Sequence, residues 1–301
     1  MVSTPARVAA RAVDDLRAPR GRTRRERAFA ALLVAASAVA LVVLGVLVVD
    51  VLVDGLGRLN LSLLTSYTSR FAERTGFRAG ITGTISLMVL VALFAFPLGL
   101  GAAVYLEEFA PRTRFNRFVE ANINNLAGVP SVVYGLLGSA VFVHVLGFGR
   151  SLLSGALTLS LLVLPVIIVA AREALRAVPQ SIRAAGLALG ATPLQTVVHQ
   201  VIPAALPGAL TGTILALSRA IGETAPLLVV GALFSRRADS EPWFPLEAFS
   251  ALPVQIYQYI GYPQEEFQVG VASAGIIVLL VLLLGMNSVA IVLRARYARR
   301  W

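Results

Sequence analysis

The most constraining feature of the sequence is a series of apolar runs that are each long enough to cross a lipid bilayer. The first, Ala28 to Val49, contains 22 residues and no charge. A helix needs about 20 apolar residues to span hydrocarbon about 30 Å thick, and only helices and closed barrels satisfy every backbone polar group in lipid. We therefore predict an all-α membrane domain over residues 28–293, with six transmembrane helices at residues 28–49, 80–106, 121–148, 152–170, 203–234 and 269–293.

The composition agrees with this class and excludes several kinds of site. Hydrophobic residues make up 57% of the 301 residues, far more than a water-soluble domain needs. The sequence has no cysteine, and its two histidines, His144 and His199, are far apart, so we expect neither a disulfide nor a metal site. It also has no lysine, which excludes a phosphate-binding loop of the form G-x-x-x-x-G-K-[ST]. If ATP is used, another chain must hydrolyse it.

All 26 basic residues are arginines, and they gather at the ends of the apolar runs. This distribution indicates anchoring at a membrane surface and argues against nucleic-acid binding. Residues 1–27 hold eight arginines without helical periodicity and predict a disordered arm, and residues 294–301 form a basic tail. Six spans place both termini on one side, which then carries eighteen arginines against seven on the other. We predict a plasma-membrane protein with both termini in the cytoplasm, although the loops alone are nearly balanced and the orientation depends on the two tails.

Arg219 and Glu223 interrupt the fifth apolar run near its middle. An arginine at the centre of a membrane helix costs roughly 2.5–3.5 kcal/mol and is a functional-site candidate by default. A spacing of four residues puts both side chains on one helix face, close enough to pair. A structural ion bridge between helices is the alternative explanation.

The third span begins with asparagines, glycine and proline, which are tolerated at membrane depth only against protein or a water-filled cavity. We therefore expect this segment to face the centre of the bundle, or its asparagines to form hydrogen bonds between helices. The candidate residues of a substrate path are Asn124, Asn125, Ser218, Arg219, Glu223 and Thr224.

Residues Arg172 to Ile202 break the hydropathy pattern. The segment is amphipathic, with Pro179 and Pro193 around a helical stretch, and it predicts two or three short helices outside the membrane. Such a pair of helices either offers a rigid contact to a cytoplasmic partner or lies on the lipid headgroups, and the residues alone leave both open.

The run Ala184-Ala185-Gly186-Leu187-Ala188-Leu189-Gly190, followed by Ile202-Pro203, resembles the signature loop of ABC-importer permeases. Ala184 stands where that family often has glutamate, and Gln200 where it has isoleucine. The resemblance implies a coupling helix that docks on an ATPase subunit. The residues it implies for this contact are Ala185, Gly186, Leu187, Gly190, Ala191 and Thr192.

Further stretches resemble the phosphate-specific branch of these permeases, and within it the second of the two permease subunits. They are Ile123–Gly135, Leu189–Thr192, Arg219–Leu228 and Asn287–Ala290. The resemblance implies a type I importer permease bundle (MetI-like) that passes inorganic phosphate into the cell, with Arg219 as anion contact and Glu223 as its counterion.

The resemblance also implies that the chain is not itself an enzyme and binds no cofactor. Its implied partners are a homologous second permease subunit, a dimer of ATP-binding subunits that carry ATP and Mg²⁺, and an extracytoplasmic phosphate-binding protein. Two alternatives stay open. The substrate is another oxyanion such as sulfate, molybdate or phosphonate, or the chain is an ion-gradient-driven transporter. An intramembrane enzyme would need an acid–base or metal constellation that these residues do not supply.

Overall fold

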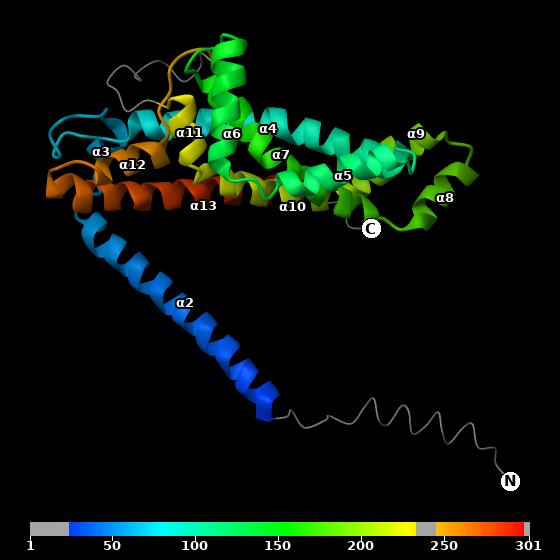
Figure 1. Ribbon diagram of the computed structural model, residues 1–301, viewed down its shortest axis with the longest axis horizontal. Coiled ribbons are helices and arrows are strands. Elements are labelled where there is room, and N and C mark those ends of the chain that lie inside the picture. Colours follow the sequence, from blue (N-terminus) through cyan, green and yellow to red (C-terminus); the bar gives the residue numbers. More distant parts are fainter. Residues whose placement is uncertain (1–23, 233–244, 298–301) are drawn as a thin grey trace. The chain divides into compact units, whose positions relative to one another are not determined.

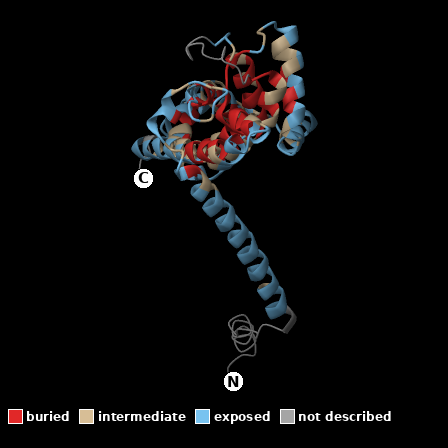
Figure 2. Cartoon of the chain, turned by 90° about the vertical axis from the view of Figure 1, so that its left-hand side faces the viewer, coloured by how far each residue is buried: buried red, intermediate tan, exposed pale blue. Residues whose placement is uncertain are grey.

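Residues 24–232 and 245–297 are described by the computed structural model, and they contain helices but no strand. Residues 1–50 and residues 51–301 form two separate compact units. The first unit consists, where it is described, of the apolar helix α2 (Arg24–Leu56), which continues into the second unit. Nearly all of its residues 26–50 are exposed (Figure 2). An exposed apolar helix of this length is consistent with a lipid-facing span.

Four long helices form the framework of the second unit, α4 (Arg78–Val104), α7 (Leu152–Arg176), α10 (Ile202–Ile221) and α13 (Ala272–Tyr297) (Figure 1). α7 packs against both α4 and α10 and is the most buried of them. Small residues make this close packing possible. A Cβ on Gly99 would meet Ile167 at 2.6 Å, and one on Gly208 would meet Ala174 at 2.9 Å. Such small-residue contacts let membrane helices approach closely without a hydrophobic driving force.

The predicted third span is not one straight helix. α5 (Arg114–Leu126) is followed by α6 (Ser131–Gly138) and the π-helix η2 (Ser139–Val145) after a bend of 106°. Gly128 and Pro130 explain the break, because glycine is a poor helix former and proline restricts the residue before it. Residues 107–120, between the predicted second and third spans, are also mostly helical. The π-helix η1 (Tyr105–Phe109) extends α4, and α5 begins at Arg114, where the hydroxyl of Thr113 accepts from the Asn116 amide.

The predicted fifth span, residues 203–234, is displaced along the chain. α9 (Pro193–Thr196), the π-helix η3 (Val197–Val201) and α10 form one helix of 29 residues that ends at Ile221, and the short α11 (Ala225–Val230) follows. Pro203 does not start the helix. It sits directly after a π-helical turn in which the Ile202 amide donates to the Val197 carbonyl. The chain is therefore already helical when it reaches this residue without an N–H group.

The other helices differ from prediction mainly at their ends. α2 starts earlier and ends later than residues 28–49, α7 continues through Arg176, and the π-helix η4 (Glu266–Val271) precedes α13. Shorter helices are α3 (Leu61–Thr65), α8 (Gln180–Ala188) and α12 (Leu252–Ile260). Within the described ranges, five helices are long and apolar enough to cross a membrane, or six if the bent α5–α6 pair counts as one. Residues 24–27 of the predicted disordered arm belong to α2, whereas its residues 1–23 and the end of the basic tail at 298–301 lie outside the described residues.

Candidate functional site

The predicted ion pair between Arg219 and Glu223 is confirmed. Arg219 Nε donates to Glu223 Oε1 at 3.3 Å. The Glu223 side chain is only 17% exposed, whereas that of Arg219 is 59% exposed. Because the contact uses Nε, both terminal amino groups of the guanidinium stay available to an anion. A half-buried carboxylate thus holds an exposed cation in place.

The pair does not lie within a continuous helix, as the sequence suggested. Arg219 is in the last turn of α10, which ends at Ile221, and Glu223 lies in the break before α11. The Gly222 and Glu223 amides close the helix end by donating to the Arg219 and Ala220 carbonyls. A cation in the last turn interacts favourably with the helix dipole. Broken helices at membrane depth are tolerated where they are buried in protein or line a cavity.

Arg219 borders a small hollow of about 10 Å³, roughly the space of one water molecule. The α5–α6 bend contributes Leu126, Ala127 and Val129 to its wall, and the Tyr134 hydroxyl donates to the Leu126 carbonyl across the bend at 2.8 Å. The bend therefore lies beside Arg219. Asn124 and Asn125 are exposed on α5 and are not part of this wall, so the structure does not bring them to Arg219.

Ser218 and Thr224 flank the pair and take structural positions. The Ser218 hydroxyl lies 2.6 Å from Asn287 Oδ1 on α13 and 2.7 Å from the Ile214 carbonyl, so it links two long helices. Thr224 is half-buried and precedes α11, where its carbonyl accepts from the Leu228 amide.

The predicted coupling residues form a compact turn between α8 and α9. Gly190, at φ +82°, ends α8 in the left-handed conformation. The amides of Ala191 and Gly190 donate to the carbonyls of Gly186 and Leu187, the paired bonds of a Schellman motif. Thr192 then starts α9 with a capping box in which it exchanges hydrogen bonds with Gln195 at 3.2 and 2.9 Å. The turn is therefore fixed by its own backbone.

Apolar side chains are exposed around this turn. Leu187 is 50% exposed, Leu189 90% and Leu194 60%. Gly186 faces the other way, because a Cβ there would meet Thr196 at 2.7 Å. The segment thus packs on α9 with one face and presents apolar side chains with another. Exposed apolar side chains gathered in this way are typical of a protein contact or a membrane contact.

Sequence reasoning missed the contacts that attach α8 to the helix bundle. Arg183 on α8 binds Glu108 through two hydrogen bonds, from Nε at 3.2 Å and from Nη2 at 2.6 Å. Its terminal nitrogens also donate to the carbonyls of Val178 and Leu175 at the end of α7. The available signal was two adjacent glutamates, Glu107 and Glu108, directly after one predicted span and an arginine in the amphipathic segment after another. The predicted orientation depends only on the arginines and gives the two glutamates no role.

Comparison with known proteins identifies the family. Residues 95–300 match the family described as "Binding-protein-dependent transport system inner membrane component". The chain is 32% identical over 204 residues to the probable ABC transporter permease protein YqgI of Bacillus subtilis, with 68% of this chain and 69% of that protein covered. It is 34% identical to the phosphate transport system permease protein PstA 1 of Mycobacterium tuberculosis, with 75% of this chain and 71% of that protein covered. The PstA protein of Xylella fastidiosa is 31% identical, with 80% and 83% covered.

A solved structure supports the same fold. The MetNI methionine ABC transporter in an inward-facing conformation superposes with a TM-score of 0.59 at 22% identity, over 73% of this chain and 95% of the matched chain. The predicted all-α importer-permease fold is thereby confirmed, and with it a multi-pass membrane protein. The chain belongs to the family of binding-protein-dependent transport system inner membrane components.

Proposed function

We propose that this chain is a permease subunit of an ATP-driven importer that carries inorganic phosphate into the cell. The observation that carries the proposal is the Arg219–Glu223 pair, with its exposed guanidinium at the break between α10 and α11. Two of the relatives described above are named phosphate transport system permeases, and this supports phosphate over other oxyanions.

The geometry suits a passing oxyanion. A guanidinium offers a planar, permanently charged set of donors that matches phosphate oxygens. A single exposed arginine attracts an anion without trapping it among several charges. Glu223 neutralises Arg219 when no anion is present, and its second oxygen can accept from a protonated phosphate oxygen. Sulfate at neutral pH offers no such donor.

Transport is driven by ATP hydrolysis on a separate dimer of ATP-binding subunits, which bind ATP and Mg²⁺. The turn between α8 and α9 is the contact to this dimer, through Leu187, Leu189 and Leu194, and it faces the cytoplasm together with both chain termini. The helix that follows the turn supports this role. α9, η3 and α10 form one helix of 29 residues from Pro193 to Ile221, so a movement at the turn is passed along one element to Arg219.

A homologous permease subunit completes the path, because one chain of this fold forms half of it. An extracytoplasmic phosphate-binding protein delivers the anion to the segments between α2 and α4 and before α13. Asn124 and Asn125 are exposed on α5. We assign them to the remaining part of the path or to the contact with the second permease.

The test is uptake of radiolabelled phosphate by the whole complex in ATP-loaded proteoliposomes. Loss of a charge-assisted hydrogen bond worth about 1.5–3 kcal/mol should lower uptake by Arg219→Ala by about tenfold or more. Arg114→Ala, an exposed arginine at the start of α5, is the matched control. Uptake by Arg219→Ala at the level of this control would contradict the proposal.

Two further measurements address the open alternatives. Uptake that needs no ATP, or a stable transport-competent complex without a nucleotide-binding subunit, would favour an ion-gradient-driven transporter. Competition by sulfate against phosphate should increase in Glu223→Gln, and unchanged competition would remove Glu223 from selectivity.

A further inference from the structure

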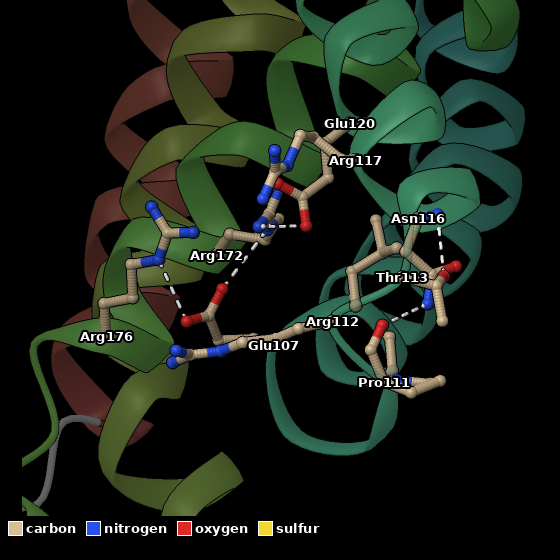
Figure 3. A pocket seen from close by; sticks show the side chains of 11 residues that line it. Glu107, Pro111, Arg112, Thr113, Asn116, Arg117, Glu120, Arg172 and Arg176 are labelled. Atoms are coloured by element: carbon tan, nitrogen blue, oxygen red, sulfur yellow. Dashed lines mark hydrogen bonds and ion pairs between the residues drawn. The ribbon is translucent and has the colours of Figure 1, made fainter.

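A second polar hollow lies where η1, α5 and α7 meet, and the proposed phosphate path does not use it. Its volume is about 340 Å³, enough for a small anion with its water. None of its lining residues borders the hollow beside Arg219. Figure 3 shows that charged side chains from all three elements and the η1–α5 loop point toward it. We refer to it as the α5–α7 pocket and define it by Glu107, Arg112, Arg117, Glu120, Arg172 and Arg176.

The carboxylates of this pocket are already engaged. Arg172, whose side chain is 8% exposed, contacts Glu107 at 3.3 Å through Nε and Glu120 at 3.1 Å through Nη2. Arg176 contacts the other oxygen of Glu107 at 2.9 Å (Figure 3). It also contacts Glu173 at 3.1 Å. Each lining glutamate is therefore neutralised by an arginine of α7.

Two of the four arginines of the pocket are not engaged by these glutamates. Among the residues that the structure describes, neither Arg112 nor Arg117 forms an ion pair, and both are exposed. The loop that carries Arg112 is held in place, because Asn116 Nδ2 donates to the Pro111 carbonyl at 2.7 Å. Arg117 directly follows Asn116 near the start of α5. Four arginines thus line the pocket with two glutamates, a surplus of positive charge at a fixed position.

We propose that the α5–α7 pocket binds a phosphate group, held by Arg112 and Arg117 and backed by the Arg172–Glu107 ion pair. Arginine donors match phosphate oxygens, and a pocket lined by them favours a dianion or an anionic diester over chloride. The group comes either from an acidic lipid headgroup or from free phosphate in the cytoplasm. Solvated surface arginines without a ligand are the competing explanation.

Binding here would act on the attachment of α8. Glu107 in the pocket is the sequence neighbour of Glu108, which binds Arg183 of α8. A phosphate group that bridges the η1–α5 loop and α5 therefore stabilises the position of η1. Because Glu108 of η1 binds Arg183, it also stabilises the position of α8. This proposal is independent of the phosphate path.

A single introduced cysteine provides the test. The chain has no cysteine of its own, and Ala110, which lines the pocket, is half-buried on the η1–α5 loop. The Ala110→Cys variant is assembled in the full complex, and its rate of reaction with a neutral maleimide is measured. In detergent, sodium phosphate is compared with sodium chloride at equal ionic strength. In nanodiscs, phosphatidylcholine alone is compared with phosphatidylcholine that contains phosphatidylglycerol.

We expect labelling to slow in at least one arm. Slowing by phosphatidylglycerol identifies a lipid headgroup, and slowing by sodium phosphate identifies a free anion. Adding Arg112→Gln and Arg117→Gln should shift the half-protecting concentration up by about tenfold or more, because charge-assisted hydrogen bonds are lost. Arg114→Gln, also on α5 but outside the pocket, is the matched control and should keep the protection.

Two results of the labelling experiment would overturn the proposal. One is the absence of protection in both arms. The other is equal protection in the double-arginine variant and the Arg114→Gln control. Native mass spectrometry of the complex gives a second measurement that does not depend on the reporter. A phosphatidylglycerol or phosphate adduct that survives the double substitution unchanged would also contradict the site.

Discussion

Arg183 on α8 holds Glu108 at the end of η1 with two hydrogen bonds, of 3.2 and 2.6 Å, in a pair that is largely closed to solvent. The Arg183 side chain is 16% exposed and that of Glu108 8%. The pair joins α8 to the end of the helix that begins with α4. It is thus an attachment of α8 to the bundle in addition to the packing of α8 on α9 and η3.

Removing Glu108 should therefore loosen α8. Breaking a buried pair by deleting one partner costs about 3–5 kcal/mol, because the other charge is left uncompensated. We expect Glu108→Ala to lower the Tm of the purified complex. It should also lower the ratio of phosphate transported to ATP hydrolysed, which a purely structural loss would not change. Glu173→Ala removes an exposed partner of Arg176 and should do neither. An unchanged coupling ratio in Glu108→Ala would show that this pair does not position α8.

Gly186 should tolerate no larger side chain. A Cβ there would meet Thr196 Cγ2 at 2.7 Å and Oγ1 at 2.8 Å, closer than real contacts. Overpacking of this kind costs about 1–3 kcal/mol. Gly186→Val should accelerate proteolysis between α8 and α9, whereas Ala185→Val, at the exposed neighbouring position, should not. Equal proteolysis of the two variants would mean that α8 does not pack on α9 as described.

The contact between Ser218 and Asn287 should show a measurable coupling energy. Their 2.6 Å hydrogen bond joins α10 to α13, and hydrogen bonds between membrane helices average about 0.6 kcal/mol. A double-mutant cycle with Ser218→Ala and Asn287→Ala should return a value of about this size. Ser288→Ala is the control, since the Ser288 hydroxyl donates within α13 to the Leu284 carbonyl. A cycle energy near zero would contradict the link.

Alkaline pH should destabilise the cluster around α12. Tyr259 is fully buried, lies 2.7 Å from Thr75 Oγ1, and packs edge-on against Phe77. Burial raises the pKa of Tyr259 above its ordinary value, while hydrogen bonds with Thr75 and Gln255 lower it less. An unfolded tyrosine has a pKa of about 10, so the folded state holds this proton to higher pH.

The direction in which pH changes the stability follows from the difference between the folded-state and unfolded-state pKa of Tyr259. The contribution of Tyr259 to stability is complete below pH of about 10 and is lost as the pH rises through its folded-state pKa. Tyr259→Phe should lower the Tm at neutral pH by removing the hydrogen bond to Thr75. It should also reduce the fall in Tm on going to alkaline pH, measured by thermal scans in a pH series. A fall as steep as in the unmodified chain would assign the alkaline loss to another group.

Much of the fold could be predicted from the sequence, because long apolar runs leave few alternatives in lipid. α2, α4, α7 and α13 appear close to the expected residues for this reason. The bend before α6 was harder to predict. The predicted third span begins at residue 121, inside the amphipathic helix Arg114–Leu126, and the chain bends only after Leu126. The position of α10 was misjudged because Pro203 was taken as a helix start, whereas the chain is already helical when it reaches this residue.

The candidate site, like the fold, could be predicted from the sequence only in part. The Arg219–Glu223 pair could be predicted because a spacing of four residues leaves both side chains within reach. The contacts of Arg183 with Glu108 and of Arg172 with Glu107 join residues 75 and 65 positions apart. No local spacing encodes such pairs, and only the packing of α4 against α7 brings them together. The roles of Asn124 and Asn125 stay predictions for the same reason, since a second permease chain would complete their surroundings.

The π-turn at Val197–Val201 sets the rotational phase between the two ends of the helix that contains it. Each residue of an α-helix turns the chain by about 100°, so inserting or deleting one residue in this turn would rotate Arg219 by that angle relative to Leu194. The direction in which the exposed Leu194 of α9 points and the direction in which Arg219 points are thus fixed relative to each other. A chain with the same residues at both ends but a regular α-helical turn between them would aim its arginine elsewhere.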